Sequence, residues 1–129
     1  MTGTRAQRTM NEAMLERARD VGRLLGQTRE YRALQRARQE LNEDRESVEQ
    51  VNRLAQLEQE LGLMLQRGEE PPEDKQREYE EVFSQLQTGP RYQALVAAQT
   101  NFDKLLQQVN EQIGAGIEAG SKSSIIISS

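Results

Sequence analysis

The chain has 129 residues, of which 35% are hydrophobic, 29% are charged and only 4% are aromatic. One domain is the usual arrangement at this length, but so small an apolar share gives the chain reason to bury surface against a second copy or another protein. The sequence contains neither Cys nor His. This excludes disulfides, zinc knuckles and cysteine-ligated iron–sulfur clusters, and it removes the commonest general base. We therefore expect no enzyme, no metal and no other cofactor.

The net charge of −4 is distributed unevenly along the chain. Residues 1–45 carry 10 basic and 7 acidic side chains, whereas residues 46–129 carry 7 basic and 14 acidic ones. Such an uneven distribution of charge favours head-to-tail packing of oppositely charged helices or docking to a charged partner. It is too weak to indicate non-specific binding of nucleic acid.

No apolar run approaches the roughly 20 residues that a membrane span requires. The first residues, 1–7, lack the apolar segment of a secretory signal. We therefore expect a cytoplasmic protein without membrane insertion.

Apolar residues recur at intervals of three and four over nearly the whole chain, which predicts helices. The first helix is expected to begin at a capping box formed by Thr9 and Glu12 and to end at Gly26. Its apolar stripe consists of Met10, Met14, Ala18, Val21, Leu24 and Leu25. A second, arginine-rich helix is predicted over residues 28–41, with a stripe of Tyr31, Leu34, Ala37 (or Ala33) and Leu41.

Two further helices are predicted on either side of a proline-containing break. The third covers residues 47–67, with a second capping box at Ser47 and Gln50 and a glycine stop at Gly68. The fourth begins near Pro72, and acidic residues in its first turn complement the helix dipole. Its apolar stripe is Tyr79, Val82, Phe83 and Leu86, and Gly89 precedes the next break.

The last helix is the longest, over residues 90–117, and would extend roughly 40 Å. Its apolar side chains form a heptad-like seam over about three heptads, consisting of Tyr92, Leu95, Phe102, Leu106, Val109 and Ile113. The shorter helices of one compact chain cannot cover a helix of this length. We therefore expect this seam to be the surface of self-association.

The predicted fold is an all-α bundle of about five helices, in which the long C-terminal helix forms a dimer interface. Residues 1–8 are expected to be disordered, residues 9–117 to form a single helical-bundle domain, and residues 118–129 to be a flexible tail rich in Ser and Ile. The triplet at residues 125–127 has an alternative interpretation, a short strand that adds to the edge of a partner.

The basic residues of the first two helices are the only concentration of positive charge in the chain: Arg17, Arg19, Arg23, Arg29, Arg32, Arg36 and Arg38. They form either a solvated face that pairs with the acidic later half, or a face that docks an acidic partner surface or the backbone of RNA. Few aromatic side chains are available to stack on bases, which weakens the RNA interpretation.

Three stretches resemble a bacterial family of regulators, the YlbF/YmcA type. They are Ala-Arg-Asp-Val-Gly-Arg-Leu-Leu at 18–25, Thr-Arg-Glu-Tyr-Arg-Ala-Leu at 28–34, and Gly-Pro-Arg-Tyr-Gln-Ala-Leu-Val-Ala-Ala-Gln at 89–99, which heads the final helix. The likeness extends over about residues 13–117.

The resemblance implies a small helical protein that self-associates and does not catalyse a reaction. Some members of such families act in a complex that supports competence, sporulation and biofilm formation, and they are linked to the endoribonuclease RNase Y and to mRNA maturation. Some carry iron–sulfur clusters on cysteines, many of these in a cysteine-rich tail. This chain has no cysteine, so it is similar to a cysteine-free branch and no cluster is implied.

We therefore expect a regulatory adaptor that forms a dimer or larger homo-oligomer and binds a protein of the RNA-processing machinery through its arginines. One alternative is a structural or holdase-like coiled-coil protein that grips client proteins with its helix ends and its isoleucine tail. A second is an RNA-binding helper that uses the arginine face.

Overall fold

The structure is a computed structural model that describes the backbone of residues 4–128 and the side chains of residues 4–122. These residues form five helices and no strand, which confirms the predicted all-α architecture. The helices are α1 (Arg5–Leu25), α2 (Arg29–Glu43), α3 (Arg45–Gln66), α4 (Glu73–Thr88) and α5 (Pro90–Ser128).

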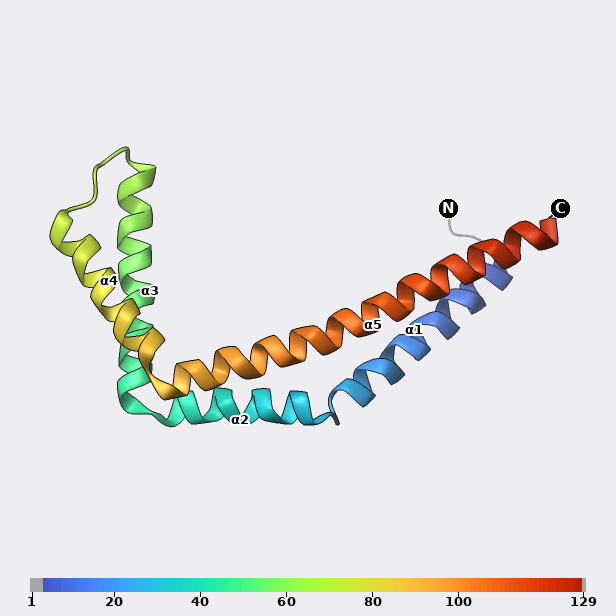
Figure 1. The fold of residues 1–129 in the computed structure, drawn as a ribbon. Helices are drawn as coiled ribbons and strands as arrows, with labels where there is room; N and C mark the ends of the chain where they lie inside the picture. The colour runs from blue at the N-terminus through green and yellow to red at the C-terminus, as the bar shows by residue number, and fades with distance from the viewer. Residues whose placement is uncertain (1–3, 129) are drawn as a thin grey trace.

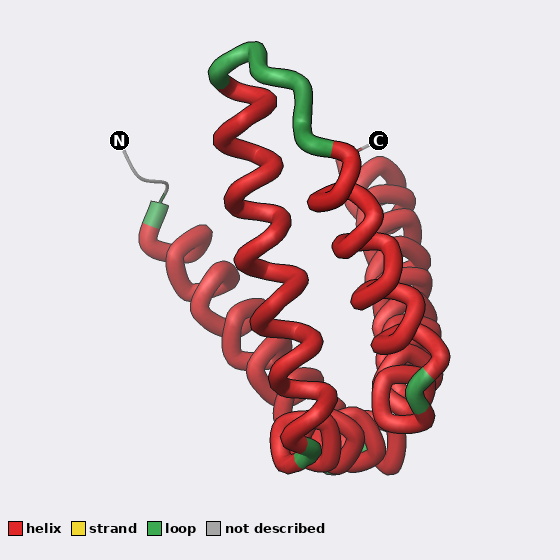
Figure 2. The backbone as a smooth tube through the Cα atoms, turned by 90° about the vertical axis from the view of Figure 1, so that its left-hand side faces the viewer, coloured by secondary structure: helices red, strands yellow, loops and turns green. Residues whose placement is uncertain are grey.

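The five helices form two arms that meet at a corner (Figure 1). In the long arm, α2 lies against the first half of α5, and α1 continues the arm towards the C-terminal end of α5. The short arm is a hairpin of α3 and α4, which pack against each other. Viewed along the long arm, α1 and α5 diverge instead of packing together (Figure 2). The long arm therefore has a core at only one of its ends.

The core of the long arm lies between α2 and α5. Leu34 and Ala37 of α2 are buried together with Ala98 of α5, and Leu95 and Phe102 pack against them half-buried. These positions follow the spacing of three and four residues that places side chains on one helix face. The α2–α5 contact therefore fixes the direction of the long arm.

The short arm has a buried core of its own, made by Leu54 and Leu57 of α3, while Leu86 is the buried residue of α4. Across the hairpin, the Arg53 guanidinium donates to both carboxylate oxygens of Glu78 at 2.7 Å. Such a bidentate pair fixes the relative position of two helices better than a single contact does.

The chain leaves α3 through a glycine in the left-handed region, since Gly68 has a φ of 73°. The amide of Gly68 donates to the carbonyl of Leu65, and the amide of Glu69 donates to that of Met64. These two bonds form a Schellman motif, in which a residue without Cβ adopts the left-handed conformation at low cost. The predicted glycine stop at this position is confirmed.

Two predicted helix starts are wrong by a few residues. The N-cap of α1 is Thr4, whose hydroxyl accepts from the amide of Gln7, while the hydroxyl of Thr9 donates to the carbonyl of Arg5 inside the helix. The N-cap of α3 is Asp44, which accepts from the amide and the hydroxyl of Ser47. A carboxylate at this position interacts with the helix dipole as well as with the orphan amides.

The last helix is longer than predicted, because α5 continues beyond Ile117 to Ser128. Lys122 pairs with Glu118 at 3.3 Å, one turn earlier, and such i,i+4 pairs support a helix. The backbone of residues 118–128 is therefore helical where the sequence suggested a flexible tail. The side chains of the isoleucine triplet lie outside the described residues, and so do residues 1–3 and 129.

Candidate interaction surface

The apolar face of α1 is not covered by any other part of the described chain. The helix contains no buried residue, and Met10, Met14 and Leu24 are 70%, 60% and 65% exposed. Only the end of the helix approaches the rest of the arm, where Leu25 is half-buried. An amphipathic helix normally buries such a stripe, so this face is a candidate for contact with another molecule.

The six residues predicted to form the seam of α5 do not share one environment. Leu95 and Phe102 pack against the buried cluster of α2, and the Phe102 ring lies 5.4 Å from that of Tyr31. Tyr92, Leu106 and Val109 are half-buried, and Ile113 is 54% exposed. Part of the seam is thus used inside the chain, and its role in self-association stays a prediction.

Beyond Val109 the described part of α5 has no covering at all. Every residue from 110 to 122 is exposed. Ile117 is 68% exposed and lies one turn after Ile113, so the two isoleucines lie on one side of the helix. Sequence reasoning omitted Ile117, although its spacing of four from Ile113 was a sufficient signal.

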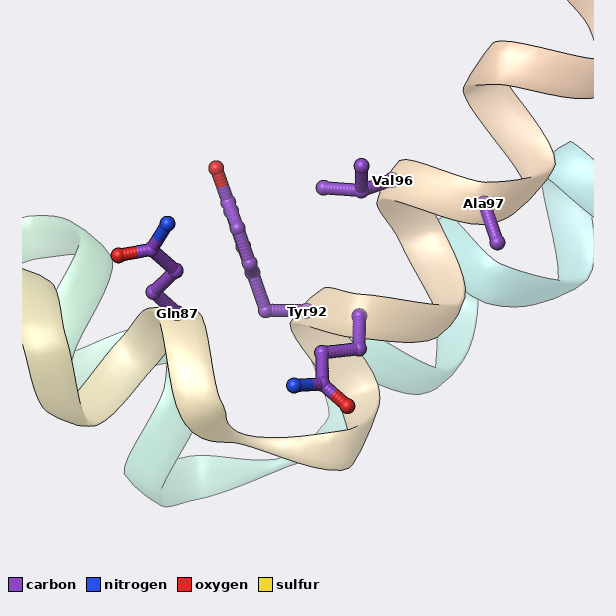
Figure 3. A pocket seen from close by; sticks show the side chains of 5 residues that line it. Gln87, Tyr92, Val96 and Ala97 are labelled. Carbon is purple, nitrogen blue, oxygen red and sulfur yellow. The ribbon is translucent and has the colours of Figure 1, made fainter.

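A surface pocket of about 440 Å³ lies at the corner between the arms. Tyr92 and Val96 of α5 point into the space beside Gln87 of α4 (Figure 3). Val96 is 46% exposed, and Phe83, one turn before Gln87 on α4, is 38% exposed. Val96 directly follows Leu95, so it lies beside the predicted seam and not in it.

The predicted docking arginines are all exposed, on two helices that meet at the turn after Leu25. Arg23 pairs with Asp20 of the same helix at 2.9 Å, and Arg38 donates to the amide oxygen of Gln99 at 3.4 Å. Among the residues that the structure describes, no ion pair joins these arginines to the acidic α3–α4 hairpin. Their role in docking stays a prediction.

The shifted pKa values lie at the hairpin and at a helix cap, where they belong to structural contacts. Hydrogen bonds from Arg53 lower the pKa of Glu78, and the bond that Tyr79 donates to Glu58 at 2.9 Å raises the pKa of that phenol. Hydrogen bonds from Ser47 lower the pKa of Asp44. Among the side chains of residues 4–122, no group of three or more carboxylates is placed to hold a metal ion.

Among the described residues, no helix is both long enough and apolar enough to cross a lipid bilayer. Apolar side chains are exposed at α1, at the far half of α5 and at the corner, and so are Leu63 and Leu65 of α3. The fold and these surfaces define an elongated, all-helical protein with apolar helix faces exposed to solvent.

The chain belongs to the YlbF/YmcA family, because the family model described as control of the competence regulator ComK, YlbF/YmcA, matches residues 14–118. The predicted resemblance is thereby confirmed, and the family is a regulatory one. A search of curated proteins gave no match.

Proposed function

We propose that this protein is a non-enzymatic regulatory adaptor of the cytoplasm, which associates with itself and binds a partner protein. The observation that carries the proposal is the apolar face of α1, with Met10, Met14 and Leu24 more than half exposed. Burial of one such side chain contributes about 1.5–3 kcal/mol. A helix with several of them on one face therefore has a strong driving force for association.

The regulatory part of the proposal is supported by the family, which is described as controlling a competence regulator. The resemblance to YlbF/YmcA-type proteins makes RNA-processing machinery the partner that we propose, with RNase Y-linked mRNA maturation as the process. The exposed arginines of α1 and α2 supply a surface that would attract an acidic partner.

Sedimentation of the purified protein at micromolar concentration tests self-association. We expect a mass above the 14.7 kDa of one chain. Met14→Asp places a charge in the apolar face and should shift the protein towards the monomer. Thr9→Asp is the matched control, because it adds the same charge to α1 outside the apolar stripe. A wild-type monomer would refute the proposal.

Cross-linking mass spectrometry after a pull-down from the native host tests the partner. We expect RNA-processing proteins to be captured by the wild type and lost with a double variant, Arg32→Glu and Arg36→Glu, that keeps its wild-type helicity. Direct RNA binding by the pure protein with a steep salt dependence would instead favour the RNA-binding alternative.

A further inference from the structure

We propose that α1 is a hinged arm that closes onto the far half of its own α5, and that this closure covers the apolar faces used for association. The far half of α5 is residues 110–122, all of which are exposed. The inference rests on the proposed self-association and specifies its regulation. In the open form, which the structure shows, both faces are exposed. A partner that binds these faces therefore favours the open form over the closed one.

The face of α5 that α2 covers does not end where α2 ends. Ala98 and Phe102 belong to the contact with α2. Intervals of three and four residues continue the same face to residues 105, 109, 113, 116 and 120. On this continuation Ile113 is 54% exposed, and a Cβ added at Gly116 or Gly120 would extend into open space. An established helix contact thus stops halfway along a face that remains free of charged side chains.

The apolar face of α1 lies on the side of that helix from which α5 diverges. Leu25 is half-buried where α1 approaches the rest of the long arm. Val21 and Met14 precede it by one and three turns, so they lie on the same side of the helix as Leu25. They are 37% and 60% exposed because α1 and α5 move apart beyond this point (Figure 2). A rotation that brings the helices together therefore brings two apolar faces together.

Closure buries little charge, because the charged residues of both helices lie away from these faces. On α1 they follow residues 12, 16, 19 and 23, a line two residues after Met14 and hence about 200° around the helix. On α5, Glu111, Glu118 and Lys122 lie two residues after the face positions 109, 116 and 120. Arg17 adjoins the face of α1, and so long a side chain can keep its guanidinium in water.

The contact between α2 and α5 also determines which residues meet on closure. Tyr31 of α2 lies beside Phe102 of α5, with ring centroids 5.4 Å apart. Since the two helices run antiparallel, residues before Tyr31 lie beside residues after Phe102 (Figure 1). In the same register a closed α1 places Met14 beside about residue 119, to within one turn. The long, adaptable side chain of Met14 fits the space above Gly116 and Gly120.

The hinge is the turn at residues 26–28, between α1 and α2. The hydroxyl of Thr28 accepts from the amide of Tyr31 at 3.1 Å, which caps α2 without any group from α1. The arm can therefore rotate without unfolding α2, by changes in a few backbone dihedrals of the turn. So short a connection keeps α1 beside its own α5 at a roughly millimolar effective concentration, about 100-fold above that of a second copy at ~10 μM. This favours the chain's own α1 as the helix that covers α5.

Pairs of cysteines test closure, because the natural chain has none. The test pair, Met14→Cys with Ile117→Cys, places one thiol on each face. The control pair combines Met14→Cys with Ala115→Cys, whose position is about 200° around α5 from Ile117. All three positions are exposed, so the variants should keep the fold.

Mild oxidation with copper–phenanthroline joins thiols only where the two Cα atoms come within about 7 Å. We expect the test pair to form a disulfide within one chain, at least about tenfold faster than the control pair, whose Cβ atoms point apart. The oxidised test variant should then sediment at the 14.7 kDa of one chain, whereas its reduced form should sediment at a higher mass.

A disulfide within one chain in the test pair alone, together with a monomeric oxidised form, supports the proposal. A disulfide that joins two chains means that a second copy's α1 covers α5, which overturns closure while self-association stands. Equal linking of both pairs, or of neither, overturns the inference, because α1 then has no preference for this face. An oxidised variant that sediments like its reduced form overturns the regulatory role. If the wild type and the reduced variant are both monomers, the proposed self-association is refuted, and the disulfides still decide whether α1 closes.

Discussion

Leu34 is the side chain on which the long arm depends most. It is 1% exposed and lies in the cluster that joins α2 to α5. Truncation of a buried leucine to alanine destabilises proteins by about 2–5 kcal/mol, through lost transfer free energy and the cavity that remains. Leu95 and Phe102 beside it are only half-buried, so they can move into the space. We therefore expect Leu34→Ala to lower the free energy of unfolding by about 2–3 kcal/mol, in the lower part of that range.

Urea denaturation followed by circular dichroism at 222 nm measures this change. The comparison requires one protein concentration throughout, because self-association makes stability depend on concentration. In thermal melts the same loss corresponds to roughly 10 °C for a chain of this size. Leu65→Ala is the matched control, because Leu65 is 66% exposed and the same substitution there should change stability by less than about 0.5 kcal/mol.

Equal losses in the two variants would refute the reasoning. They would mean that the α2–α5 contact does not form the core of the long arm, and that Leu34 is as dispensable as a solvent-facing leucine. A loss well above about 5 kcal/mol would also contradict it, since the half-buried neighbours would then have failed to close the cavity.

Four further predictions concern the short arm. Gly68→Ala should destabilise the protein by about 1–2 kcal/mol, because a Cβ disfavours its φ of 73°. Gly62 lies inside α3, where an added Cβ would meet no other atom, so Gly62→Ala should stabilise the protein by about 0.5–1 kcal/mol. Urea denaturation measures both changes. Glu78 has a lowered pKa in the fold, so its pairing with Arg53 stabilises the hairpin above the ordinary glutamate pKa of about 4.3. That contribution should be lost as the pH falls through the lowered pKa. In Glu78→Gln, the free energy of unfolding should therefore depend less on pH over this range. Tyr79 has a raised pKa, so its hydrogen bond to Glu58 should be lost as the pH rises through that pKa, above about 10. The phenolate absorbance of Tyr79 should therefore appear at a higher pH than that of a free tyrosine.

The sequence by itself determined the helices. Spacings of three and four, the Gly68 stop and the prolines at the breaks are local signals, because helix formation depends on neighbouring residues. The absence of Cys and His likewise removed whole classes of chemistry without any knowledge of the fold. The errors were at helix ends, where competing caps such as Thr4 and Thr9 differ by small energies.

Only the tertiary structure decided which apolar stripes are satisfied inside the chain. Periodicity marks an apolar face but does not say what covers it, because that depends on where helices distant in sequence lie. Leu95 and Phe102 have the same spacing as Ile113, yet α2 covers the first two and nothing in the described chain covers the third. The same holds for α1, whose stripe is as regular as that of α2 but faces solvent because α1 and α5 diverge (Figure 2).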